Sequence, residues 1–236
     1  MKENILGYSV DVLSLSECIG SIIESLDTSK RATWLACLNP HSYAVALKDK
    51  PFSTALKNAD WLIPDGIGIV YASKILGGHI RQRVTGPDIF TALHEELNLA
   101  GGFRVVFLGG SDETLSITKD KMRDDYPEID VVGTYSPPYK ESFSSYDIDE
   151  MISAVNSTRA DILWVGLSAP KQEKWIYENR ERINAGFIGA VGAVFDFYAG
   201  TVRRSPPIFR KIGLEWLPRL LQQPRRLWRR MFISAP

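Results

Sequence analysis

Residues 103–109 read FRVVFLG, a short apolar run ending in glycine, and they open the alternation that decides the fold. Helix-like and apolar segments then follow in turn: SDETLSITKDKMRDDY (111–126), IDVVG (129–133), a helical stretch after Asp147, DILWVG (161–166), KQEKWIYENRERINA (171–185) and FIGAV (187–191). Short apolar strands that alternate with helices are typical of a parallel sheet covered on both faces. We therefore predict an α/β fold, a Rossmann-like parallel sheet with helices on both faces.

The first hundred residues are also mixed. Ser14 followed by Glu17 fits a capping box that opens a helix. TWLACL (33–38) predicts a strand ending at Asn39, and WLIPDG (61–66) predicts a short strand ending at a turn. Open α/β sheets place their ligands at strand ends of this kind.

Length and composition fit one domain with an extension. With 236 residues and 44% hydrophobic content, the chain can bury one substantial core. We expect an α/β catalytic domain over residues 1–202, made of an N-terminal α/β part (1–100) and a Rossmann-like part (101–202). A basic helical appendage would follow over residues 203–236.

The chain shows no targeting or membrane-spanning pattern. No apolar run approaches the roughly 18 residues needed to cross a bilayer, and the start MKENILGYSV lacks the charged-then-apolar pattern of a signal peptide. Cys18 and Cys37 have no spacing that suggests a zinc site or a disulfide framework. We expect a cytoplasmic protein, or one attached to the cell membrane from its inner face, with both cysteines reduced and buried.

A net charge of zero hides an uneven distribution. Residues 203–236 hold nine Lys and Arg residues against one acidic residue, Glu215, which leaves 19 basic and 27 acidic residues in 1–202. A basic tail on an acidic body indicates a polyanionic partner, either nucleic acid or an anionic membrane. A solvated basic end without a partner is the alternative.

The end of the chain has two opposed faces. In RRLWRRMF (225–232), a helical arrangement places the four arginines within an arc of about 140° and the four apolar residues on the opposite arc. A basic helix with Trp, Leu and Phe on its other face is typical of an element lying in a membrane interface. Each arginine near an anionic leaflet contributes about 1 kcal/mol. A core-packing helix with a solvated basic face remains open, whereas nucleic acid is disfavoured because base-reading polar residues are missing.

Asp65 lies in IPDGIGIVYASKIL, between a short strand and an apolar helix. A carboxylate at a strand end could accept the proton of a sugar hydroxyl, and such general-base assistance is worth about 10² to 10⁴ in rate. Aspartate is also a favoured helix N-cap, so a structural role is the alternative.

Arginines precede the next helix start. Arg81 and Arg83 come just before Gly86-Pro87-Asp88. A guanidinium can make two parallel hydrogen bonds to phosphate oxygens and hold charge on a departing nucleoside diphosphate. Ordinary surface arginines would give the same sequence.

Two more segments follow strand ends. FLGGSDET, with Gly109, is a glycine-rich turn whose backbone N–H groups could receive a diphosphate, although it is neither a dinucleotide fingerprint nor a P-loop. SAPKQEKW offers Lys171 and Gln172 to phosphate, nucleobase or sugar, with Trp175 beneath them. An ordinary strand-to-helix turn explains each segment equally well.

No metal site is predicted. Asp147 and Asp149 form a D-x-D string, through which many glycosyltransferases bind a divalent metal, but acidic residues are expected at a helix N-terminus anyway. The histidines 41, 79 and 94 are scattered without metal-ligand spacing. We expect neither a metal nor another cofactor.

Six segments in order give the chain a resemblance to the bacterial WecG/TagA/CpsF glycosyltransferase family over nearly its whole length. They are LNPHSYAVAL (38–47), ADWLIPDGIGIVYASKILG (59–77), RVTGPDIF (83–90), VGLSAPKQEKWI (165–176), GAVGAVFDFYAGTVRRSP (189–206) and GLEWLPRLLQQPRRLWRR (213–230). The resemblance implies an inverting, metal-independent transferase. Its donor would be a UDP-sugar, such as UDP-linked N-acetylmannosamine, its uronic acid or glucose, and its acceptor a saccharide on polyprenyl diphosphate, for teichoic acid, common antigen or exopolysaccharide.

The resemblance also implies roles for individual residues. Asp65 would deprotonate the acceptor hydroxyl, and Arg83 would stabilise phosphate charge. Residues implied to bind substrate are Asn39, Cys37, Gly66, Thr85, Asp88, Gly109, Lys171, Gln172 and the tail arginines Arg203, Arg204, Arg219 and Arg226. Cys37 departs from the family, since relatives often carry threonine there, which puts one substrate hydrogen bond in doubt.

Two rival functions can be stated. A nicotinamide-dependent oxidoreductase needs a dinucleotide fingerprint, and the glycine spacing of FLGGSDET is wrong for it. A non-catalytic membrane-docking scaffold explains the tail but gives Asp65, Arg83 and Gln172 no role. The donor sugar, the pathway and the oligomeric state, including a homo-oligomer, stay open.

Overall fold

A six-stranded parallel sheet forms the centre of the protein. The computed structural model describes residues 1–29 and 31–203. Within them the strand order is β4-β3-β8-β7-β5-β6, and every pairing in this sheet is parallel. The strands are β3 (Thr33–Leu38), β4 (Trp61–Pro64), β5 (Phe103–Leu108), β6 (Ile129–Tyr135), β7 (Ile162–Val165) and β8 (Phe187–Ala190). This confirms the predicted Rossmann-like sheet.

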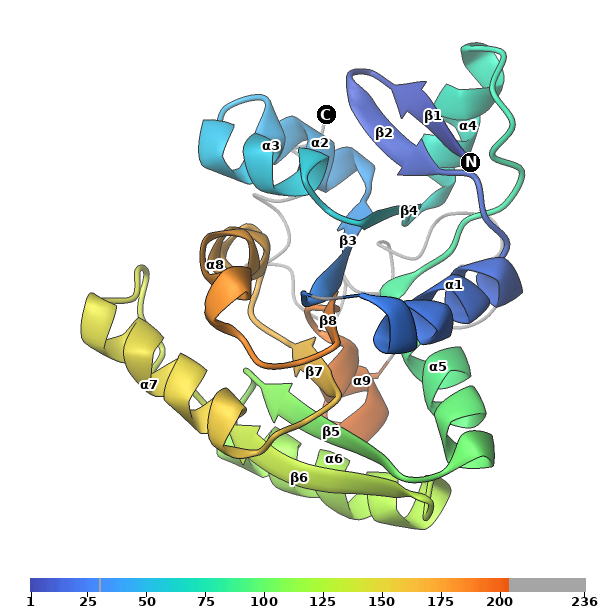
Figure 1. Ribbon diagram of the computed structural model, residues 1–236. Helices are drawn as coiled ribbons and strands as arrows, with labels where there is room; N and C mark the ends of the chain where they lie inside the picture. The colour runs from blue at the N-terminus through green and yellow to red at the C-terminus, as the bar shows by residue number, and fades with distance from the viewer. Residues whose placement is uncertain (30, 204–236) are drawn as a thin grey trace.

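Helices cover both faces of this sheet (Figure 1). One face packs against α2 (Pro40–Ala46), α3 (Lys50–Lys57), α4 (Ile67–Ile75), α7 (Ser145–Ser157) and α8 (Lys171–Asn179). The other face packs against α1 (Leu15–Thr28), α5 (Gly86–Ala100), α6 (Asp112–Asp125) and α9 (Val194–Ala199). A short 3-10 turn, η1 (Arg180–Arg182), follows α8.

Alternate side chains of the strands fill the two cores. In β7, Leu163 and Val165 enter one core, while Ile162 and Trp164 enter the other, and all four are fully buried. The side chains of a strand point to opposite faces in turn, so a strand covered on both sides must be apolar throughout. This explains the continuous apolar runs of the sequence.

Several local expectations are confirmed and others are refined. Ser14 and Glu17 form the expected capping box at the start of α1. The helix expected over 171–185 ends at Asn179, and the one expected after Asp147 begins at Ser145. Cys18 is buried as expected, whereas Cys37 is partly exposed as a residue although its thiol group is enclosed.

A hairpin at the N-terminus was not predicted. β1 (Lys2–Ile5) and β2 (Tyr8–Asp11) pair antiparallel and pack beside β4 and α4. Its buried side chains, Ile5, Tyr8 and Val10, extend the core on the α3 side. β3 and β4 lie in the same sheet as β5, β6, β7 and β8, so residues before and after position 100 build one sheet and share its two cores.

Across residues 1–29 and 31–203, no helix combines the length and the apolar content needed to span a bilayer. The predicted basic appendage falls almost wholly on residues 204–236, outside the described residues.

Candidate active site

Asn39 and Asp65 meet where β3 and β4 end. The two strands are in register, with Cys37 opposite Ile63 and Leu38 opposite Pro64. The residues that follow therefore leave the sheet at the same edge, and the Asp65 N–H donates to the Leu38 carbonyl over 2.8 Å. The Asn39 side chain then donates from Nδ2 to Asp65 Oδ2 over 3.3 Å.

The amide of Asn39 is held by a helix cap. Its Oδ1 accepts the Ser42 N–H over 2.9 Å, and the Ser42 hydroxyl in turn accepts the Asn39 N–H over 2.8 Å. Both bonds belong to the capping box of α2, in which asparagine is a favoured residue. Since the oxygen is engaged by the cap, the NH₂ group is the part of the amide that faces Asp65.

Asp65 is not the N-cap of α4, so the N-cap alternative for this residue is wrong. The N-cap is Gly66, with φ of 125° and no side-chain cap hydrogen bond. A Cβ at Gly68 would lie 2.5 Å from Pro40 Cγ, so the glycine lets the start of α4 approach the start of α2. The local sequence thus brings two helix starts together beside the carboxylate.

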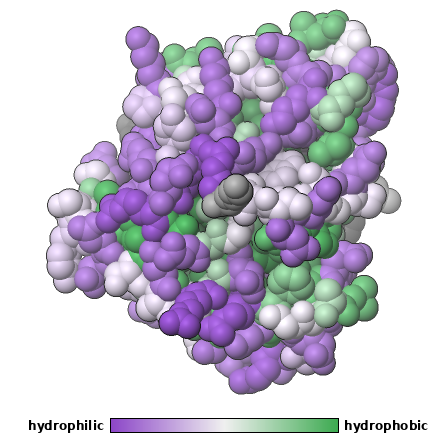
Figure 2. Space-filling model, viewed as in Figure 1, coloured by the Kyte–Doolittle hydropathy of each residue, from purple (hydrophilic) through white to green (hydrophobic). Residues whose placement is uncertain are grey.

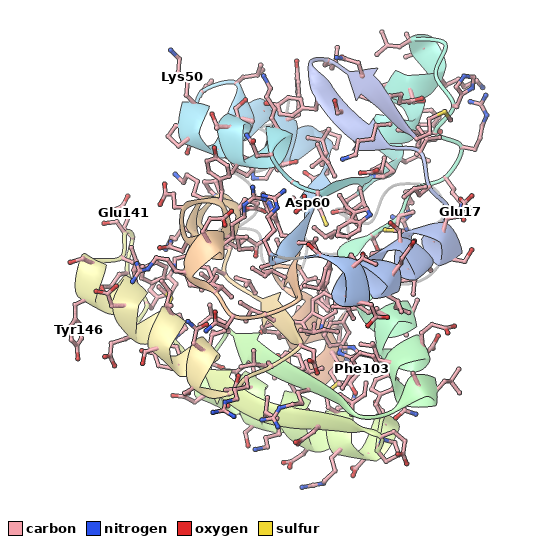
Figure 3. The ribbon with its side chains drawn as sticks, viewed as in Figure 1. Glu17, Lys50, Asp60, Phe103, Glu141 and Tyr146 are labelled. Carbon is pink, nitrogen blue, oxygen red and sulfur yellow. The ribbon has the colours of Figure 1, made fainter. Side chains whose placement is uncertain are left out.

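At the other end of β4, Asp60 has a structural role. Asp60 precedes the strand, and its carboxylate accepts the Trp34 N–H over 3.0 Å. It also pairs with Arg31 at 3.2 Å and Arg180 at 3.5 Å (labelled Asp60 in Figure 3). Two cations and a backbone donor hold Asp60 in place at the amino end of β4, and Asp65 lies at the opposite end of the same strand.

The segment carrying Arg83 runs along the end of β4. The Val84 N–H donates to the Pro64 carbonyl over 3.1 Å, which places Arg83 next to the strand end that precedes Asp65. Arg83 is partly exposed. Thr85 and Asp88 form the capping box of α5, with Thr85 Oγ1 donating to Asp88 Oδ2 over 2.7 Å. This bond positions the helix and gives both residues a structural role.

Cys37 lies between the end of β8 and the start of α5. Its Sγ is 3.9 Å from the Ala190 carbonyl oxygen, and a Cβ at Gly86 would come within 3.8 Å of the sulfur. The thiol is enclosed, so burial raises its pKa well above the ordinary value, and the charge of nearby Asp65 adds to the shift. The group therefore stays a neutral thiol at physiological pH.

Gln172 ties α8 to the turn after β8. It is only 4% exposed, and its Oε1 accepts the Gly192 N–H over 3.1 Å while its Nε2 donates to Glu173 Oε1 over 2.9 Å. Gly192 has a positive φ of 58°, which glycine adopts without strain. The amide of Gln172 thereby fixes the loop between β8 and α9.

Gly109 marks a close approach of two strand ends. It has φ of 109°, and a Cβ there would lie 2.7 Å from the carbonyl carbon of Gly166, which follows β7. The Gly109 N–H donates to the Tyr135 carbonyl over 2.9 Å. The glycine is thus required by packing, whatever ligand the turn receives.

Comparison with known proteins decides the family. The chain matches the Glycosyl transferase WecG/TagA/CpsF family over residues 3–236. It belongs to that family. The protein is therefore a glycosyltransferase, and the resemblance drawn from the six segments is confirmed.

Named relatives agree with this assignment. N-acetylglucosaminyldiphosphoundecaprenol N-acetyl-beta-D-mannosaminyltransferase of Bacillus spizizenii is 33% identical over 211 residues, 89% of this chain and 78% of the relative. Proteins of the same name are 30% identical in Bacillus subtilis, over 86% of this chain and 75% of theirs, and 25% identical in Staphylococcus aureus, over 97% and 87%.

Other predicted residues of this glycosyltransferase lie apart from Asp65. Lys171 turns toward the loop before α7, where its Nζ donates to the Lys140 carbonyl and lies 5.7 Å from the ring centroids of Tyr139 and Phe143. Arg203 is exposed at the end of the described residues. Arg204, Arg219 and Arg226 lie outside the described residues.

The D-x-D aspartates are engaged by protein groups. Asp147 caps α7 and pairs with Lys140 at 2.8 Å, and the hydrogen bonds from Lys140 and then Ser144 lower its pKa to about 2. Asp149 pairs with Arg182 at 2.6 Å. Among the described residues, no group of three or more His, Cys, Asp or Glu side chains is placed to hold a metal ion.

Two residues of the site were not singled out from the sequence. Glu173 is 3% exposed, bonds to Gln172 and raises the pKa of Cys37, and Ser42 is 4% exposed in the cap of Asn39. Glu173 lies three residues before the buried Ile176, on the inward stripe of α8. A charged residue on a buried stripe was the signal that would have found it.

Hollows on the described surface lie elsewhere. A groove of about 570 Å³ between α1 and α5 is lined by Leu15, Ile19, Ile23 and Ala92 with Glu95 and Glu96 at its rim, among others. None of the predicted site residues lines it. The site is therefore defined by side chains at the sheet edge, and this groove is a separate feature.

Proposed function

We propose that this glycosyltransferase moves a sugar from a UDP-sugar to a saccharide carried on polyprenyl diphosphate, with inversion and without a metal. The observation that carries the proposal is the Asn39–Asp65 contact of 3.3 Å, which holds a partly exposed carboxylate at the carboxyl edge of the sheet. Ligands of open α/β sheets bind at this edge. The printed names of the relatives, which specify a diphosphoundecaprenol acceptor, support the acceptor class.

The chemistry is a single displacement. The acceptor hydroxyl attacks the anomeric carbon, Asp65 takes the hydroxyl proton, and the bond between the anomeric carbon and the diphosphate breaks with both electrons leaving on UDP. One displacement inverts the configuration at the anomeric carbon. Asn39 keeps the carboxylate oriented toward the attacking hydroxyl, and a positioned base is worth about 10² to 10⁴ in rate.

Arg83 supplies positive charge where the leaving group develops negative charge. Its backbone runs beside the strand end that precedes Asp65. A guanidinium can donate two parallel hydrogen bonds to a diphosphate, from either donor or acceptor. In this proposal Gln172 acts on the donor by positioning the turn at Gly192. Thr85, Asp88 and Gly66 shape the walls of the substrate-binding site.

Metal independence is supported by the state of the D-x-D aspartates. Asp147 is paired with Lys140 and Asp149 with Arg182, so a cation would have to displace both ion pairs. Charge on the departing UDP is then neutralised by arginine side chains.

The donor and the place of action are part of the same proposal. N-acetylmannosamine is the sugar named in the relatives, and its uronic acid or glucose are the other candidates. The catalytic domain would comprise residues 1–202, and the basic segment 203–236 would dock on the inner face of the cell membrane, where anionic lipids attract arginines.

The test is UDP release with purified full-length protein. The protein is incubated with a panel of UDP-sugars, a short-chain polyprenyl-diphosphate GlcNAc acceptor and EDTA. Asp65→Asn should lower release by about 10² or more, because the base is lost while the shape is kept. The matched control is Asp130→Asn. Asp130 is an exposed aspartate on β6, the outermost strand on the side of the sheet away from β4, and its variant should release UDP at the wild-type rate.

Each component of the proposal has its own contrary outcome. Release abolished by EDTA, or by Asp149→Asn, would overturn metal independence. Release that is unchanged in Asp65→Asn would remove Asp65 as the base. If no donor gives release while the protein still binds vesicles, the scaffold function replaces the polyprenyl-acceptor proposal.

A further inference from the structure

Helix α4 turns apolar side chains outward. Tyr71 is 58% exposed, Ile75 84% and Leu76 54%. Ile67, Tyr71, Lys74 and Ile75 fall within an arc of about 100° on one side of the helix. Figure 2 shows hydrophobic surface at the upper right, where Figure 1 draws α4 and the N-terminal hairpin.

The inward side of the same helix packs Ile69, Val70 and Ala72 against the core. Ser73 is fully buried, and its Oγ accepts the Ile80 N–H over 3.1 Å, with Ile69 buried on the same side. A water-exposed helix normally carries polar residues on its outward side, whereas α4 carries Tyr71 and Ile75 there. Adjacent exposed apolar side chains of this kind mark a surface that meets a partner.

The residues of α4 and of the segment after it carry positive charge, although Glu3 of β1 lies against that segment, where its Oε2 accepts the His79 N–H over 2.6 Å. Residues 66–87 contain no Asp or Glu, although acidic residues outnumber basic ones in 1–202. They contain Lys74, Arg81 and Arg83, and both Lys74 and Arg81 are exposed. An apolar face flanked by cations suits an anionic lipid surface, whose headgroups attract lysine and arginine.

The face is joined directly to the site. Gly66, the N-cap of α4, follows Asp65, and β1 of the hairpin packs against the helix. Tyr71 and Ile75 lie about one and two turns along α4 from that end. The start of α4 is therefore fixed beside the carboxylate, and Tyr71 and Ile75 follow at about 8 and 14 Å along the helix axis.

We propose that the outer face of α4 is a membrane-contact surface, with Tyr71 and Ile75 entering the interface of an anionic bilayer. This contact deepens the proposed function, on which it rests for the lipid-linked acceptor. It involves other residues of the chain than the basic segment 203–236, and it orients the molecule so that the carboxyl edge of the sheet meets the acceptor at the lipid surface.

The first test places an environment-sensitive fluorophore on α4 of the full-length chain. Ile75→Cys is labelled and mixed with vesicles of phosphatidylglycerol and phosphatidylcholine, with and without brominated acyl chains. The control is Leu99→Cys, an equally exposed leucine (81%) on α5 beside the acidic Glu95 and Glu96. Cys18 is buried and the Cys37 thiol is enclosed, and labelled wild type gives the background.

Emission at position 75 should rise about threefold with vesicles and be quenched by the brominated lipid, while position 99 stays unchanged. Absence of quenching at position 75, or equal quenching at both positions, overturns the proposal. A rise at position 75 on concentrating the protein without lipid would instead assign the face to a second copy of this chain. None of these readouts depends on transferase activity, so the proposed function can fail separately.

The second test uses turnover. Ile75→Glu should lower the rate about tenfold on acceptor embedded in anionic vesicles and leave the rate on a water-soluble short-chain acceptor unchanged. Leu99→Glu is the control and should match wild type on both acceptors. An equal loss of Ile75→Glu activity on both acceptors would indicate damage to the fold and contradict the membrane contact.

Discussion

Asn39 donates to Asp65 across the ends of two strands, with 3.3 Å between Nδ2 and Oδ2, while the oxygen of the same amide caps α2. The Asn39 side chain therefore makes two hydrogen bonds, one that caps α2 and one that holds the Asp65 carboxylate. Because the cap fixes which end of the amide faces the carboxylate, the stability of α2 and the orientation of Asp65 are linked through a single residue.

Asn39→Asp separates these two bonds. Aspartate caps a helix as well as asparagine does, so α2 keeps its cap, and any loss of unfolding free energy at pH 7 comes from repulsion between the two carboxylates. The NH₂ donor is replaced by a second carboxylate, which opposes ionisation of Asp65. We expect kcat to fall at least about tenfold at pH 7 and the acidic limb of the pH–rate profile to move to higher pH.

Asn39→Ala is the companion variant. It removes the cap and should cost about 1 kcal/mol of stability, together with a loss of kcat. If Asn39→Asp keeps the wild-type kcat, Asn39 contributes to the site only through the fold.

Gly109→Ala tests the close approach of the ends of β5 and β7. The new Cβ would lie 2.7 Å from the Gly166 carbonyl carbon, and φ of 109° is unfavourable for alanine, so we expect a loss of about 3 kcal/mol or more. Gly102→Ala separates the two causes, because Gly102 also has a positive φ, 79°, but has open space around its Cβ position. It should lose only about 1 kcal/mol. Equal losses in urea unfolding would mean that the contact with Gly166 costs nothing.

His94 should make the fold sensitive to mild acid. It is fully buried, it accepts the Trp164 Nε1–H over 3.1 Å, and burial lowers its pKa to about 3. In the unfolded chain the pKa returns to about 6.5, so between these values the unfolded state binds more protons and stability falls as the pH falls. Between pH 7 and pH 5 this group alone should cost about 2 kcal/mol.

His94→Gln keeps an acceptor for Trp164 and removes the titration. Urea unfolding at pH 7 and pH 5 should therefore show a smaller loss in the variant than in wild type by about 2 kcal/mol. The same loss in both proteins would place the acid sensitivity at other groups, and Asp147 is not among them, because its lowered pKa affects stability only below about pH 5.

The strands of the central sheet were predictable because a strand buried on both faces has a continuous run of apolar residues. TWLACL and DILWVG are continuous apolar runs, and both are strands with buried side chains on each face. The two strands of the N-terminal hairpin have no such apolar run. KENI and YSVD are four residues each, and their turn places Leu6, a residue with no turn preference, at φ of 51°.

The site was predictable in part for the same reason. Asn39 and Asp65 follow apolar strands, and strand ends gather ligands in this class of fold. The links through Gln172 could not be predicted, since its contacts with Gly192 depend on how α8 meets the end of β8. Glu173 was missed because a charged residue at a helix start is usually solvated.

The pairing of β3 with β8 bears on how the protein is made. The Thr33 hydroxyl bonds to the Gly186 carbonyl across 153 residues of sequence, so β3 has only β4 beside it until β8 is synthesised. At about 5–20 residues per second, this leaves an apolar strand edge of the nascent chain open for roughly ten seconds. Translation speed between β4 and β8, and chaperones that cover the edge meanwhile, should therefore govern how much of the newly made chain escapes aggregation.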